Sequence, residues 1–299
     1  MKLATATADF MPYTHCQIKS MELVREAGFH YVDYSFYTDY RDQCGIYGEN
    51  PEKHIEDVIR AADGLGLQLV QAHAPMGKPI SEDNSAFVRD TIASVDACGR
   101  MGIPNLVVHA GYAPGLTVAQ TFQKNKEFFM PVLECAEKYG INILIENFNK
   151  MTKPDVYWTD NARDLLAQIQ CVNHPLFHAV WDVGHANLQE MPQDAELRLL
   201  GNHIRALHIH DNLGDADTHL LPYFGTLNLD SVMHGLQDIG YNGYFTFDVG
   251  RIFTPADLRR EFLSDTRLVN TPLALRCSAE RYLYEMGKCI LEAYNCFEE

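Results

Sequence analysis

Six short apolar runs in this sequence each end in or beside a side chain that could bind a metal ion. The runs read LVQAHAP, LVVHAG, ILIENF, AVWDVGH, ALHIHDN and FTFDVG. Their candidate ligands are, in order, His73, His109, Glu146, Asp182, His208 and Asp248. Imidazole and carboxylate groups are common protein ligands of divalent metals. The sequence therefore predicts a divalent metal site, provided that the fold brings these side chains together.

The spacing of the six residues indicates how the fold brings their side chains together. The intervals between them are 36, 37, 36, 26 and 40 residues, about one strand plus one helix per step. In a parallel barrel every strand delivers its C-terminal end to the same rim. Hydrophobic periodicity predicts strands near residues 2–8, 30–36, 67–74, 105–110, 142–147, 177–183, 204–210 and 243–249. Amphipathic stretches predict helices near 16–27, 51–64, 83–101, 117–139, 160–170, 194–201 and 229–239.

Eight strands alternating with helices favour an α/β fold with a single (β/α)8 TIM barrel and an extra C-terminal helical segment. We expect one domain over 1–299, with the barrel over about 1–262, including a closing helix after Pro255, and the C-terminal helix over about 273–298. Several glycines fall where a helix should end before the next strand, a place for positive φ. These are Gly28, Gly66, Gly102, Gly140 and Gly240.

Charge and composition limit the partners. The 299 residues include 24 basic and 40 acidic ones, for a formal charge of -16, so binding to nucleic acid through a broad basic face is unfavourable. We see neither a signal peptide nor an apolar run long enough for a membrane span. Eight scattered cysteines favour reduced thiols in a cytoplasmic protein. The aromatic-rich segment near 31–47 and the C-terminal helix are candidate surfaces for a homo-oligomer.

Three local pairs add to the candidate site. WDVGHAN places Asp182 and His185 three residues apart, and DADTHLL offers a carboxylate and an imidazole at Asp217 and His219. In LHIHDN, the alternation of side chains along a strand puts His208 and a second histidine, two residues later, on the same face. Only one of these two histidines needs to bind the metal.

In their order along the chain, these motifs resemble the xylose isomerase-like TIM barrels, a superfamily of sugar isomerases and epimerases that also contains the endonuclease IV family. The resemblance covers about residues 67–250. It rests on histidines closing the third and fourth strands, I-E-N on the fifth, D-x-x-H-A on the sixth and H-x-x-D on the seventh.

The resemblance implies a divalent metal held by Glu146, Asp182, His208 and the eighth-strand acid, Asp248. The family usually has glutamate at this last position, and the shorter side chain reaches about 1.5 Å less far. The endonuclease IV relatives imply additional ligands in a polynuclear centre. Those positions are His73, His109, His185, Asp217 and His219. Asp33 stands where many relatives carry glutamate, and both a core role and a substrate contact stay open for it.

The implied activity is a metal-dependent isomerase or epimerase acting through an enediolate on a small polyhydroxy carbonyl compound, such as a sugar, sugar phosphate or inosose. Glu146 and Asp248 would form the acid/base pair. His73, His109, His185, Asp217 and His219 would contact substrate. Manganese and zinc are the favoured metals, with magnesium and cobalt as further candidates.

Three alternatives stay open. One is a zinc phosphodiesterase of the endonuclease IV kind, which the charge of -16 disfavours. Another is a dehydratase or lyase on the same scaffold, which would share the enolisation step. The third is a barrel without turnover that keeps a metal for its structure.

Overall fold

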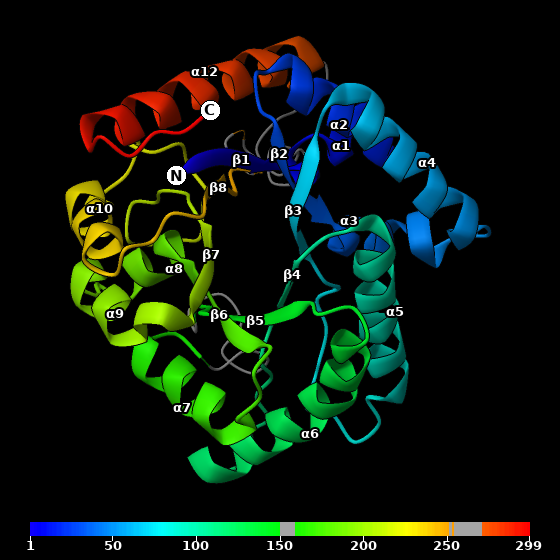
Figure 1. The fold of residues 1–299 in the computed structure, drawn as a ribbon. Helices are drawn as coiled ribbons and strands as arrows, with labels where there is room; N and C mark the ends of the chain where they lie inside the picture. Colours follow the sequence, from blue (N-terminus) through cyan, green and yellow to red (C-terminus); the bar gives the residue numbers. More distant parts are fainter. Residues whose placement is uncertain (150–158, 251–252, 254–270) are drawn as a thin grey trace, which may run out of the picture.

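The computed structural model describes residues 1–149, 159–250, 253 and 271–299, and within them eight parallel strands form a barrel (Figure 1). The strands are β1 Lys2–Ala6, β2 Tyr31–Ser35, β3 Gln68–His73, β4 Asn105–Val108, β5 Asn142–Glu146, β6 Phe177–Asp182, β7 Ile204–His208 and β8 Tyr244–Phe247. They pair in the order β7-β6-β5-β4-β3-β2-β1-β8. A parallel bridge between Ile209 and Phe247 joins the two ends. The predicted TIM barrel is confirmed.

Helices surround the strands, as Figure 1 shows. They are α1 Met11–Thr14, α2 Gln17–Glu26, α3 Phe36–Asp42, α4 Pro51–Leu65, α5 Ser85–Met101, α6 Val118–Glu137, α7 Ala162–Val172, α8 Val183–Leu188, α9 Gln193–Leu200, α10 Leu229–Asp238 and α12 Leu273–Ala293. The five glycines predicted to end helices all have positive φ. The sequence patterns did not predict α1, α3 or α8, which are short helices near the ends of β1, β2 and β6.

The alternation of side chains along the strands explains why the polar residues face the barrel interior. A small buried cluster of Val107, Leu144, Val180 and Ala206 is separate from the larger core that the strands form with the helices. Each of its members lies two residues before one of the predicted ligands. Residues two apart on a strand share a face. His109, Glu146, Asp182 and His208 therefore lie directly above this apolar layer, at the C-terminal rim.

The C-terminal helix α12 packs beside β1 and α2 (Figure 1). The closing helix expected after Pro255 and the expected end of the barrel near 262 fall outside the described residues. None of the described helices is both long and apolar enough to cross a membrane. All eight cysteines are free.

Candidate metal centre

Three of the predicted ligands converge in one buried group. One donor atom each from Glu146, Asp182 and His208 lies within 4.8 Å of the other two. The side chains of all three residues are at most 2% exposed. His208 Nδ1 lies 2.9 Å from Glu146 Oε1. The strands β5, β6 and β7 thus bring to one point residues that are far apart in the sequence.

Hydrogen bonds between side chains and backbone fix the ends of β5 and β6 relative to each other. Asn147 donates from Nδ2 to the Asp182 carbonyl at 2.8 Å, and its Oδ1 accepts the Asp182 N–H at 2.7 Å. Asp182 Oδ1 accepts the N–H of His185 at 2.7 Å and so caps α8. The I-E-N and D-x-x-H motifs therefore form one hydrogen-bonded unit, which holds Glu146 and Asp182 side by side.

The histidines that close β3 and follow β4 extend the group. His109 Nε2 lies 2.9 Å from Glu146 Oε2, and His73 Nε2 lies 3.6 Å from the same oxygen. The Nε2 atoms of the two histidines are 3.0 Å apart. His73, His109 and Glu146 therefore form a second set of mutually close donors that shares Glu146 with the first.

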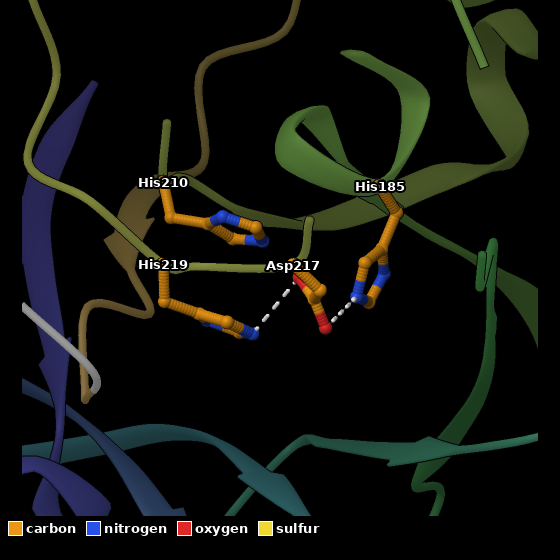
Figure 2. A group of neighbouring side chains, drawn as sticks. All are labelled: His185, His210, Asp217 and His219. Atoms are coloured by element: carbon orange, nitrogen blue, oxygen red, sulfur yellow. Dashed lines mark ion pairs between the residues drawn. The ribbon is translucent and has the colours of Figure 1, made fainter. Parts of the chain in front are cut away.

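A further set lies beside the first and is drawn in Figure 2. It comprises His185, His210, Asp217 and His219. Asp217 stands between two histidines, with its carboxylate oxygens 3.6 Å from His185 Nε2 and 3.3 Å from His219 Nε2. The rings of His210 and His219 stack with centroids 3.9 Å apart. The predicted pair Asp217 and His219 thus reaches the His185 side of the site.

Asp248 lies at the edge of this arrangement. Its Oδ2 is 3.4 Å from His219 Nδ1, and its carbonyl oxygen is 2.8 Å from the same nitrogen. Among the described residues, the sets of mutually close donors do not include Asp248. Its side chain is 27% exposed, so it borders the open side of the site. Its assignment as a metal ligand stays a prediction.

The electrostatics of the site fit a bound cation. Burial disfavours the Glu146 carboxylate, but His208 and His109 outweigh burial and hold the pKa of Glu146 well below its usual value. Burial lowers the pKa of His185, but the charges of Asp182 and Asp217 outweigh it and raise the pKa to about 10. Buried carboxylates need compensating positive charge. A divalent ion bound by Glu146, Asp182 and His208 would supply this charge in place of a proton on His208. Carboxylate and imidazole groups are common ligands of such ions.

Two residues contribute more than the sequence patterns indicated. Asp33 is 3% exposed, and its Oδ2 lies 3.2 Å from His208 Nε2 and accepts a hydrogen bond from Gln71 Nε2 at 2.6 Å. His210 Nε2 lies 3.1 Å from Asp182 Oδ1. The shared face of His208 and His210 was visible in the sequence. The contact between Asp33 and His208 spans the barrel, and no local signal predicts it.

Gly184 makes room for His210, which gives a first prediction. A Cβ atom at Gly184 would lie 2.0 Å from Cε1 of His210, so Gly184→Ala must displace that ring from Asp182 and His219. We expect divalent-metal affinity to fall about 10- to 100-fold, as on loss of a residue that orients a ligand. Isothermal titration calorimetry with Mn²⁺ measures this affinity. Gly64→Ala, where a Cβ meets nothing within 4 Å, is the matched control. Unchanged metal affinity in Gly184→Ala would show that His210 has no part in the site.

Comparison with known proteins places this barrel in a family. The family model described as the xylose isomerase-like TIM barrel matches residues 21–263. The chain therefore belongs to the xylose isomerase-like TIM barrel family.

Several relatives carry names that state an activity. Fructoselysine 3-epimerase of Escherichia coli O157:H7 is 30% identical over 141 residues, which cover 47% of this chain and 50% of that protein. The 2-oxo-tetronate isomerase of Haemophilus influenzae is 24% identical over 236 residues, covering 75% and 83%. A crystal structure of a D-tagatose 3-epimerase-like protein superposes with a TM-score of 0.75 at 21% identity and covers 99% of this chain and 98% of that one. This structural likeness shows a shared fold.

Proposed function

We propose that this protein is a divalent-metal-dependent isomerase or epimerase of a small polyhydroxy carbonyl compound, a ketose or ketose derivative. The observation that carries the proposal is the buried convergence of Glu146, Asp182 and His208 at the barrel rim. Two relatives, one named as a 3-epimerase and one as an isomerase, support this class of reaction.

Manganese or zinc bound at Glu146, Asp182 and His208 would polarise the carbonyl and neighbouring hydroxyl oxygens of the substrate and stabilise enediolate charge. Glu146 would take the proton from the carbon next to the carbonyl, and Asp248 would return a proton on the opposite face. His185 would orient the substrate hydroxyls. Glu146 would act in its ionised form, which a bound divalent ion and the neighbouring His109, whose Nε2 lies 2.9 Å from Glu146 Oε2, would favour.

The remaining histidines and Asp217 have two roles that the geometry supports. They would contact the substrate hydroxyls, since hydrogen-bonding groups around a site fix the orientation of a ligand. The sets His73, His109, Glu146 and His185, His210, Asp217, His219 would also accommodate further ions. A site with several bound ions would favour a zinc phosphodiesterase as the alternative function. The net charge of -16 opposes it, because a DNA backbone is polyanionic.

One experiment distinguishes these functions. The protein is incubated with Mn²⁺ or Zn²⁺ in D₂O with a panel of ketoses and ketose conjugates, and the products are followed by NMR and mass spectrometry. We expect deuterium to enter at the carbon next to the carbonyl, with formation of an isomer of the same composition. A product lighter by one water would identify a dehydratase instead. Chelator-sensitive cleavage of abasic duplex DNA, without any exchange into sugars, would establish the phosphodiesterase.

A further inference from the structure

A buried arginine on the C-terminal helix lies behind the rim of the site. Arg276, on α12, is only 1% exposed. Its Nη2 donates to Asp9 Oδ2 at 2.5 Å and to Glu280 Oε2 at 2.6 Å, and both carboxylates are buried. Thr5, at the end of β1, donates to the other oxygen of Glu280 at 2.6 Å. This Arg276 cluster, comprising Thr5, Asp9, Arg276 and Glu280, therefore joins α12 to the end of β1.

The same arginine also holds the segment that follows β8. Arg276 Nη1 donates to the carbonyl of Val249 at 3.2 Å, one residue after Asp248. The next residue, Gly250, packs closely on the cluster, since a Cβ there would lie 3.2 Å from Asp9 Oδ1. The turn that carries Asp248 thus rests on the Arg276 cluster.

Asp248 is held from the other side by the site itself. Its N–H donates to the Ile209 carbonyl at 3.1 Å, and its carbonyl oxygen is 2.8 Å from His219 Nδ1. The backbone of residues 248–249 is therefore fixed between His219 inside the barrel mouth and Arg276 behind it. A shift of the Val249 carbonyl would move the adjacent Asp248 side chain relative to His219.

Docking of α12 does not by itself require charge. Buried ion pairs can often be replaced by apolar side chains with little loss of stability, and an apolar contact between α12 and the barrel already exists at Leu283 and Ile290. The Arg276 cluster buries one positive group with two carboxylates where α12 meets the segment that follows β8. Its hydrogen bonds have a directionality that apolar packing lacks, and one of them ends beside Asp248.

We propose that Arg276 is a positioning residue that sets the Asp248 carboxylate in the site through the Val249 carbonyl and Asp9. The inference rests on the proposed function for its effect on turnover, but not for its effect on the position of Asp248. The C-terminal helix is then part of the active-site framework as well as an addition to the barrel.

The test uses paired substitutions in the metal-loaded full chain. Arg276→Met with Glu280→Met removes one charge of each sign, which avoids leaving both carboxylates without their cation. Arg281→Met with Glu285→Met is the matched control, because it makes the same changes at the same i,i+4 spacing on exposed positions of α12. Thermal melting establishes that both paired variants fold.

Crystal structures of both variants provide the readout that needs no substrate. We expect Asp248 to be displaced from His219 in the first variant and unmoved in the control. An unmoved Asp248 in the folded first variant overturns the inference, whatever the protein's activity. If that variant does not fold, the structure of Arg276→Lys is determined instead, because lysine keeps the charge beside Asp9 and Glu280 but has no second nitrogen for the Val249 carbonyl. A displaced Asp248 is again expected, and an unmoved Asp248 overturns the inference.

Turnover gives the second readout. Displacement of a catalytic group predicts a fall in kcat of about 100-fold with KM changed less than about threefold. In an Asp248→Asn background the same paired substitution should lower kcat by no more than about threefold, because its target is already lost. Full additivity in that background would contradict the inference. Absence of turnover in the unmodified protein would refute the proposed function and leave the structural readout decisive.

Discussion

Glu146→Gln should lower kcat by about 1,000-fold or more, because it removes at once a proposed base and a metal ligand. In the structure the two carboxylate oxygens of Glu146 face different histidines, His208 at 2.9 Å and His109 at 2.9 Å. An amide has only one oxygen to offer and carries no charge. It can neither accept a proton from carbon nor compensate the neighbouring positive groups.

Deuterium entry from D₂O into the substrate measures this loss directly, since exchange reports the proton-transfer step even when the overall equilibrium is unchanged. Glu137→Gln is the matched control. Glu137 lies 3.0 Å from His174 Nε2, but its side chain is 60% exposed and outside the site. The control should retain normal exchange. Normal exchange in Glu146→Gln as well would remove Glu146 from the mechanism.

Removal of divalent metal should lower kcat by about 1,000-fold, and re-addition of Mn²⁺ or Zn²⁺ should restore it. A Lewis acid at the reacting oxygens supplies several kcal/mol of stabilisation to the developing charge, which corresponds to that factor in rate. Metal binding to the folded chain should also raise the melting temperature, because a ligand that binds only the native state stabilises it. The measurements are activity and thermal melting after chelation and after titration with each ion.

Asp182→Asn makes this test specific to the site. Asp182 is fully buried and belongs to the Glu146 and His208 set, so its loss should weaken metal affinity by at least about 100-fold. Asp182→Asn should therefore stay inactive at the ion concentration that restores activity to the unmodified protein. Asp194→Asn, at a partly exposed position on α9, is the control. Equal metal affinity in the two variants would exclude Asp182 as a ligand.

The barrel was predictable from sequence because its signals are local. Each strand is a short run of apolar residues, and glycines with positive φ mark the turn into the next strand, as at Gly66 and Gly102. The alternation of side chains then places Glu146 above Leu144 and His208 above Ala206. The convergence of Glu146, Asp182 and His208 follows from barrel closure.

What the patterns did not predict depends on contacts across the barrel. The helix α8 is only six residues long and begins at the Asp182 cap, so periodicity has too little length to detect it. Asp33, on β2, meets His208, on β7, across the barrel interior. Asp248 lies near His219, and Arg276 donates a hydrogen bond to the carbonyl of Val249. Both contacts depend on where α12 packs against the barrel. Single-chain periodicity carries none of this information.

Anomalous diffraction from crystals grown with Mn²⁺, recorded at the manganese absorption edge, tests the metal centre most directly. We expect a peak about 2.0–2.2 Å from ligand atoms of Glu146, Asp182 and His208. Peaks confined to the set of His185, His210, Asp217 and His219, or to the protein surface, would contradict a metal centre at Glu146, Asp182 and His208. The proposed enolisation would then lack its Lewis acid.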